Sequence, residues 1–569
     1  MADDFCARCT CSLLHLGHGT GEKRKDQSNL DPEKTSLVNL ELNAQIQPAV
    51  AANSEKATPS SYVVTTPNAK QGRGSAFKQV VAALVAQLGT INTGMVFGFS
   101  AIAIPQMKSS DSFIKVNDTV ESWIASINAI GTPIGCFLSG YLSDLLGRKM
   151  TLIITQIPTL LGWVLITFAT NIDMIYAGRF FVGLGSGMVG APARVYAAEV
   201  TQPHLRGMLV AIASVGVSTG VLVEYIIGGF LHWQICAAIS SVVPLTSLIL
   251  IFLFPETPSY LMSRQKPEQA RRALGRLRGK SCNLEREMDV LINFSKQNKV
   301  QHLSGPSEIL RAILQPKVIK PFIVLALYFL IYQWSGTNAI TFYAVEIFQA
   351  SGAKMDKNYL TMILGAVRLV STVAACILCR RCGRRPLTFV SSIGCALSML
   401  GLGIYKFATM AEAAEAAKVA KAAGTTDVIL NSAHSWIPVF CIFSYTIFCT
   451  LGFLVIPWVM IGEVYPVQVR GIVGGLTTMS AHIFVFTVVK SFPFLRVALT
   501  EPGIYLMFGM IPLLGTVYLY IFLPETKGRS LQEIEDYYSG RTKTLGPAPR
   551  SVAPSAPQVL EPQKGQLLP

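Results

Sequence analysis

The chain alternates long apolar runs with short polar connections. Runs of about 20 apolar residues, long enough to cross a bilayer as an α-helix, recur between residues 79 and 523. Twelve such runs can be delimited, six on each side of a polar stretch at 256–317. We therefore predict an all-α membrane protein with twelve transmembrane helices in two pseudo-symmetric halves.

Three charged motifs occur twice, once in each half. The pairs are Glu199–Gly207 with Glu463–Gly471, Gly147–Lys149 with Gly383–Arg385, and Pro255–Thr257 with Pro524–Thr526. Such doubling places a binding site between two halves that can rock, which is the arrangement of secondary transporters.

The polar segments predict the domain boundaries. A disordered cytosolic tail is expected at 1–75, the first half at 76–255, a helical inter-half segment at 256–317, the second half at 318–523 and a cytosolic tail at 524–569. The offset between motif copies is 236 residues at Gly147 but 264 at Glu199, so 28 residues are inserted in the second half. We assign them to 408–435, where Ala, Glu and Lys favour a short helix outside the cell.

Lysine and arginine mark the orientation. Charged residues make up only 14% of the chain, and the basic ones gather in the connections after even-numbered runs, at 256–317 and near the C-terminus. Positive charge stays on the cytoplasmic side, so both termini are predicted there, in a plasma-membrane protein. The net charge of +15 is then a topology signal that suits anionic lipids, and it does not indicate a nucleic-acid partner.

The cysteines and the first residues add little chemistry. The first 75 residues hold no apolar stretch of signal-peptide length. Most of the 12 cysteines lie in apolar runs or on the predicted cytosolic side, where thiols stay reduced. Cys6, Cys9 and Cys11 lack a second ligand cluster, so no metal or cofactor is expected. No nucleophile–base pair or phosphate loop stands outside the runs, so an enzyme is not expected.

The repeated charges lie at the same predicted cytoplasmic level. Carboxylates and guanidiniums at helix ends can pair across helices, and such pairs are weak enough to open in each transport cycle. We predict that they form a cytoplasmic gate. Its members are Asp144, Arg148, Glu199, Arg206, Glu256, Arg384, Glu463, Arg470 and Glu525.

The motifs together resemble those of the sugar porter family of the major facilitator superfamily, over residues 77–540. Besides the repeats, the resemblance rests on Gly178–Phe180 with Gly183, Pro255–Leu261, Gln333–Asn338, Ile456–Trp458 and Pro524–Arg529. The basic amphipathic stretch 267–279 is similar to the helices this family carries between its halves. The resemblance implies the major facilitator fold and a small-molecule substrate, a sugar in the range of hexose to trehalose. It does not indicate an oligomeric state.

The family places its sugar contacts on spans five, seven, eight, ten and eleven. The matching positions here are Ser214, Tyr332, Gln333, Asn338, Arg368, Trp458 and His482. Gln333, Asn338 and Trp458 keep the family's residue types. The other four depart from them, so the resemblance implies a sugar-porter scaffold with a non-standard pocket.

Arg368 has two readings. An arginine about ten residues from either end of its run is costly unless it meets a partner or a cavity. It could pair with Glu346 or Glu224, or it could line the central cavity and meet substrate hydroxyls or a carboxylate. Its depth favours the cavity. Glu224 is expected to be an interfacial carboxylate, and Arg179 an anchor of span four.

Ser100 bears on energy coupling. Proton-driven relatives carry an aspartate just after Phe-Gly-Tyr on span one, whereas Ser100 follows Phe97-Gly98-Phe99 here and cannot titrate near neutral pH. Facilitated diffusion is therefore expected. Proton symport, transport of a non-sugar organic solute and a non-transporting sugar sensor stay open. Asn117, in an Asn-Asp-Thr sequon on the first outer loop, should carry an N-glycan.

Overall fold

The computed structural model describes residues 75–109, 114, 116–279, 284–298, 306–351, 355–423, 436–466, 469–529 and 531–542. The predicted N-terminal tail therefore lies outside the described residues, except for Ser75. So do residues 424–435 of the insert and the chain after residue 542.

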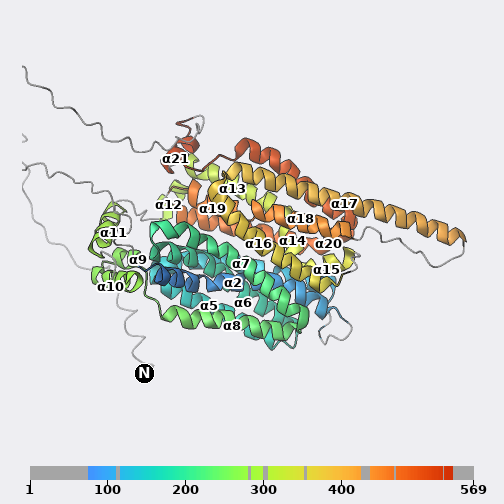
Figure 1. The fold of residues 1–569 in the computed structure, drawn as a ribbon, viewed down its shortest axis with the longest axis horizontal. Coiled ribbons are helices and arrows are strands. Elements are labelled where there is room, and N and C mark those ends of the chain that lie inside the picture. Colours follow the sequence, from blue (N-terminus) through green and yellow to red (C-terminus); the bar gives the residue numbers. More distant parts are fainter. Residues whose placement is uncertain are drawn as a thin grey trace, which may run out of the picture. The chain divides into compact units, whose positions relative to one another are not determined.

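Seven helices build the first half. They are α2 (Ala76–Met107), α3 (Asp118–Ser126), α4 (Asn128–Leu146), α5 (Arg148–Thr167), α6 (Ile172–Val200), α7 (Pro203–Phe230) and α8 (Trp233–Phe252). Figure 1 shows them running alongside one another in blue and green. Glycines allow close packing: a Cβ on Gly94 of α2 would lie 1.9 Å from the carbonyl oxygen of Val217 on α7.

The second half is also helical, but several of its helices are interrupted. It contains α13 (Pro316–Trp334), α14 (Thr337–Phe342), α15 (Ala344–Ser351), α16 (Lys357–Arg381), α17 (Arg384–Ala423), α18 (Trp436–Leu451), α19 (Ile456–Val464) and α20 (Arg470–Phe522). All regular elements of the described residues are helices, which confirms the predicted all-α class.

The number of spans is consistent with twelve. Nine helical stretches of the described residues are long and apolar enough to cross a membrane. Helices α4 and α6 are not among them. Helix α20 is counted once although Thr500, with a φ of 63°, divides it into two helices. With these three added, each half has six spans.

The breaks in the second half occur where the sequence cannot continue a helix. Gly336 separates α13 from α14 with a φ of 99°, and a Cβ there would lie 2.6 Å from the ring of Phe508. Between α18 and α19, the Phe453 amide donates to the Ser391 hydroxyl at 3.0 Å rather than to a helical carbonyl.

Short helices gather at the end of the bundle that carries the repeated charges, here called the motif end. They are α9 (Pro258–Ser263), α10 (Pro267–Arg278), α11 (Leu284–Asn298), α12 (Pro306–Ile313) and α21 (Leu531–Ser539). Helix α10 matches the predicted amphipathic stretch and buries Ala270 and Leu274. Helix α21 was not foreseen in the C-terminal tail, yet its Ile534 and Tyr538 are buried in the main core.

The insert differs from expectation. A separate short helix was predicted at 408–435, but α17 continues without interruption to Ala423, 40 residues in all. Figure 1 shows it extending past its neighbours. At 1.5 Å per residue it is roughly 60 Å long, about twice what the hydrocarbon core requires. Strong helix formers in the insert favour extending an existing helix over nucleating a new one.

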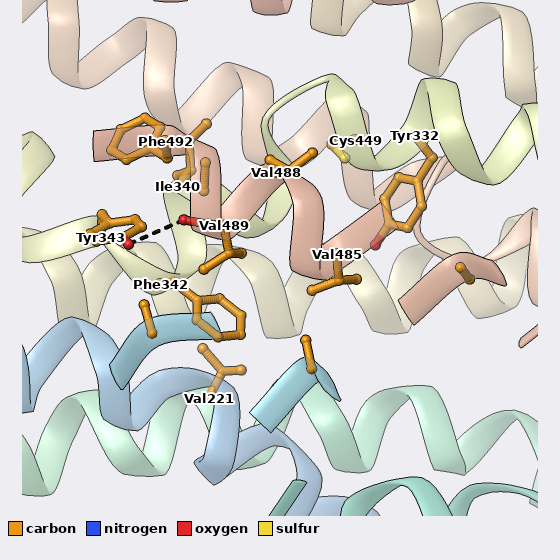
Figure 2. Close-up of a cluster of buried hydrophobic side chains, with 14 of the residues drawn as sticks. Val221, Tyr332, Ile340, Phe342, Tyr343, Cys449, Val485, Val488, Val489 and Phe492 are labelled. Carbon is orange, nitrogen blue, oxygen red and sulfur yellow. Dashed lines mark hydrogen bonds between the residues drawn. The ribbon is translucent and has the colours of Figure 1, made fainter. Parts of the chain in front are cut away.

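One apolar core joins the two halves. Figure 2 shows Val221 of α7 close to Phe342 of α14, with Val485, Val488 and Val489 of α20 beyond. All belong to a single cluster of buried residues.

Candidate functional site

The charged motif of the first half forms a compact ion-pair cluster. The Arg148 guanidinium lies 3.2 Å from a Glu199 carboxylate oxygen and 3.6 Å from Asp144. The backbone amides of Arg148 and Lys149 donate to the Glu256 carboxylate at 3.2 and 3.0 Å. Glu256 thereby satisfies the free amides at the start of α5 and complements the helix dipole.

The second half repeats this cluster with the matching residues. Arg384 pairs with Glu463 at 2.6 Å, and the Thr526 hydroxyl donates to the same carboxylate at 2.6 Å. The amides of Arg384 and Arg385 donate to Glu525, both at 3.0 Å. The recurrence of three motifs is thus explained. The Gly-Arg motif starts a helix, the Pro-Glu-Thr motif supplies the carboxylate that caps this start, and the Glu-Val motif supplies the carboxylate that pairs with the arginine.

Glycine precedes each arginine because the capping carboxylate lies so close. A Cβ on Gly147 or Gly383 would come within 2.4 Å of the Glu256 or Glu525 carboxylate. Each cluster joins helices of one half only. The side chains of Arg206 and Arg470, predicted members of the gate, lie outside the described ones.

Polar contacts between the halves occur at the opposite end of the bundle. Lys108 after α2 pairs with Glu121 on α3 and lies 3.9 Å from Glu346 on α15, which in turn pairs with Arg496 at 3.4 Å. Burial lowers the pKa of Lys108, but its hydrogen bond and attraction to Glu121 outweigh burial and raise that pKa.

A second contact between the halves lies nearby. The Lys490 ammonium donates to the Ser122 hydroxyl at 2.9 Å and stands 3.7 Å from the centre of the Trp123 ring. Together with the ion pairs around Lys108 it closes this end of the boundary between the halves.

A cavity lies between the halves in the middle of the bundle. Tyr225 of α7 meets α14, α16 and α18 there, and the Tyr225 hydroxyl donates to the Thr341 carbonyl at 2.7 Å. Most of the polar lining carries hydroxyls: Tyr225, Thr337, Thr341, Tyr445, Thr446 and Thr450. The space open to the centre of a water-sized sphere is about 20 Å³, enough for one water, so a sugar enters only if the lining moves apart.

Arg368 is the cationic side chain in the cavity's lining. It is 6% exposed, and one of its terminal nitrogens donates to the Thr341 hydroxyl at 2.7 Å. It pairs with neither acid proposed from the sequence: Glu346 is held by Arg496, and Glu224 accepts from Ser240 at 2.8 Å. Of the two readings, the structure therefore favours the cavity.

The other predicted contacts fall into separate groups. Asn338 donates to Gln333 at 2.5 Å, so the two amides face each other next to the helix break at Gly336. Tyr332 is buried, with its ring edge-on to Phe453. In Figure 2 its side chain lies on the same side as Cys449, whose sulfur contacts the Thr337 hydroxyl at 2.9 Å.

Trp458 and His482 form a third group with rings 6.0 Å apart. Arg194 of α6 stands 5.7 Å from the Trp458 ring and brings the first half to this group. The His482 ring bonds the Thr478 carbonyl at 2.8 Å, one turn back along α20. Ser214 is half-buried on α7 and is not part of the cavity lining.

Sequence reasoning missed most of the cavity. Thr337 and Thr341 stand four residues apart around the recognised Asn338, and Tyr445 and Cys449 are four apart on α18. That spacing places each pair on one helical face. It was available in the sequence, but hydroxyls in an apolar run also serve to bond helices together, so it singles out no site.

The first half holds a buried charge group. Arg179 donates to the Ser100 hydroxyl at 2.5 Å and to the Val96 carbonyl at 2.9 Å, which fits its expected role as an anchor. The expectation of an interfacial Glu224 is wrong, because its side chain is fully buried. Gly98 of α2 leaves space for the Glu224 side chain, because a Cβ at position 98 would lie 2.9 Å from the Glu224 Cβ.

Comparison with solved structures identifies the fold. The proton:xylose symporter XylE bound to 6-bromo-6-deoxy-D-glucose superimposes with a TM-score of 0.64 at 22% identity, covering 81% of this chain and 98% of that one. The inward-open XylE from E. coli gives 0.63 at 20% identity, with 80% and 99% covered. The chain therefore has the fold of major facilitator superfamily transporters, as predicted.

Comparison with known sequences identifies the family. The model of the family described as "Sugar (and other) transporter" matches residues 82–538. The facilitated trehalose transporter Tret1 of Bombyx mori is 32% identical over 459 residues, 80% of this chain and 86% of the relative. A Tret1-2 homolog of Drosophila sechellia is 33% identical over 468 residues, with 82% and 92% covered. The chain belongs to the sugar (and other) transporter family.

Proposed function

We propose that this protein moves a sugar of the hexose-to-trehalose range across the plasma membrane by alternating access, with both termini in the cytoplasm. The observation that carries the proposal is the hydroxyl-lined cavity between the halves, where Tyr225 of one half bonds Thr341 of the other. Hydroxyls that donate and accept suit a polyol, and a site at the boundary is exposed alternately when the halves rock. The facilitated trehalose transporters among its relatives support the substrate class.

In this proposal the predicted residues have three roles. Arg368 and the cavity hydroxyls hold the substrate. Gln333 and Asn338 exchange their mutual hydrogen bond for bonds to it, and Trp458 with His482 line its path toward the motif end. The arginine–glutamate pairs of the two clusters act as a cytoplasmic gate, formed in one conformation of the transport cycle and open in the other.

We further propose facilitated diffusion. Ser100 has no titratable proton, and its hydroxyl accepts from Arg179. Proton symport is the second candidate, because the buried Glu224 is a carboxylate that could carry a proton within the first half.

Uptake into liposomes reconstituted with the purified full chain tests the proposal. Trehalose and glucose should equilibrate across the membrane, exchange in counterflow and ignore a protonophore. Accumulation against a gradient that collapses with protonophore would establish symport instead, with Glu224→Gln as the variant to abolish it. Binding of sugar without counterflow would indicate a sensor and refute transport.

A further inference from the structure

The guanidinium of Arg368 is a buried charge without a countercharge. Its Nε has no hydrogen-bond partner, although it is shielded from solvent. Among the described residues, its side chain donates to the Thr341 hydroxyl, and no carboxylate forms an ion pair with it. A bare cation in the middle of a membrane bundle is costly, so a partner for it is strongly favoured.

Neither acid suggested as its partner by the sequence pairs with it. Glu224 is directed to Ser240 on α8, and Glu346 sits between Arg496 and Lys108. Arg179, a buried cation of the first half, shows the contrast. It has two backbone carbonyls and a hydroxyl as acceptors and lies under the influence of Glu224. Arg179 is thus satisfied by the protein, whereas Arg368 is not.

The unsatisfied charge faces the cavity described above. Arg368 lines it together with the hydroxyls of Thr337, Thr341 and Tyr445, so the cavity offers one fixed cation beside several groups that donate or accept hydrogen bonds. A planar guanidinium whose Nε–H lacks a partner matches a carboxylate better than a neutral hydroxyl, because a guanidinium can donate to both carboxylate oxygens.

We propose that the cavity binds a polyhydroxylated carboxylate of monosaccharide size, a sugar acid, with its carboxylate at Arg368 and its hydroxyls at the threonines and Tyr445. This inference rests on the proposed function and narrows its substrate class. A neutral sugar would leave the Arg368 charge uncompensated, whereas a sugar acid would supply the missing countercharge.

D-Glucuronate and D-glucuronamide provide the test, because they share ring, hydroxyls and size and differ in charge at one group. Binding is measured by thermal stabilisation of the detergent-solubilised full chain, and transport by competition with tracer uptake in liposomes. Glucuronate should act at concentrations about tenfold or more below glucuronamide, the effect of one charge-assisted hydrogen bond. Arg368→Gln should remove this preference, Arg368→Lys should keep part of it, and Arg271→Gln, which removes an exposed cation on α10, should leave it intact.

The outcomes separate the inference from the proposed function. Equal potency of the two ligands on the unaltered protein would overturn the inference. This comparison does not depend on the folding of any variant. Uptake of glucose or trehalose in the same liposomes would then leave sugar transport standing. A preference for glucuronate that survives in folded Arg368→Gln would also overturn the assignment of the carboxylate to Arg368. If the folded, unaltered protein neither bound nor transported any of these sugars or sugar acids, both the inference and the proposed function would be refuted.

Discussion

Breaking the arginine cluster of the second half should slow transport without weakening substrate binding. In Arg384→Ala the pair with Glu463 is lost, while the amide of residue 384 still donates to Glu525 because that bond uses the backbone. The helix start is therefore kept, and the substitution isolates the side-chain ion pair. Glu463 also keeps its bond from Thr526, so its carboxylate is not left without a partner.

The size of the effect follows from geometry and exposure. Two guanidinium nitrogens of Arg384 reach the two Glu463 oxygens at 2.6 and 3.2 Å, an arrangement that strengthens the pair. The side chains of Arg384 and Glu463 are 15% and 26% exposed. The pair is therefore intermediate between surface ion pairs, which are worth under about 1 kcal/mol, and buried ones, which cost about 2–5 kcal/mol to break. We expect loss of the pair to cost about 1–2 kcal/mol, which corresponds to roughly a 5- to 30-fold change in the equilibrium between two conformations of the protein.

That free energy acts on transport only if the pair forms in one conformation of the cycle. The ratio of that conformation to the other then falls by the same factor, and the step that starts from it slows accordingly. Counterflow rates in liposomes should therefore drop about 5- to 30-fold, while equilibrium binding changes less than twofold. Arg541→Ala, which removes an exposed pair with Asp536 on α21, is the matched control and should leave both unchanged.

A double-mutant cycle completes the assay. If Arg384 and Glu463 act through each other, Glu463→Ala alone should have a similar effect, and the double variant should lose little more than either single one. Normal counterflow with lost binding would refute the reasoning, because it would place Arg384 at the substrate. Additive losses would refute the pair as the unit that matters.

Three further predictions concern topology, coupling and folding. Asn117→Gln should abolish a glycosidase-sensitive gel shift, and an unchanged shift would contradict the topology. Asn293→Gln, in an Asn-Phe-Ser sequon of the segment predicted to be cytoplasmic, should not abolish it. Uptake should not respond to protonophore or to an inward proton gradient, because Ser100 carries no titratable group; a stimulated rate would contradict facilitated diffusion. Gly336→Ala should lower the yield of folded protein, since its φ of 99° and the Phe508 ring leave no room for a Cβ; normal yield and melting temperature would contradict this.

The helices could be predicted because lipid imposes one rule on every span. Backbone groups must be satisfied within the segment, so a long apolar run such as α8 is read directly as a helix. The breaks were harder to predict. Gly336 is required by its contact with Phe508, about 170 residues further along the chain, and such contacts leave no local pattern. The same holds for α21, whose buried face forms only against the rest of the core.

The site was predictable only in part for a related reason. The repeats located the arginine clusters because charged residues in a chain with few charges stand out. Arg368 stood out in the same way, but its acceptor Thr341 and the nearby Tyr445 did not, since hydroxyls are common in apolar spans. The direction of Glu224 toward Ser240 also required the structure, because its depth along α7 says nothing about the face on which it lies.

The two kinds of polar contact in this protein suit opposite tasks. The arginine clusters join helices within one half, and capping bonds from Glu256 and Glu525 tie each loop to the end of its own half. The contacts between halves are fewer and individually weaker, such as the hydroxyl pair of Ser218 and Thr372 at 2.7 Å. When the halves rock, the contacts between halves must break and re-form and the arginine–glutamate pairs form in one conformation only, while the capping bonds keep each helix start intact. A cavity at that boundary therefore opens at low cost, and a ligand that neutralises Arg368 would lower the cost further.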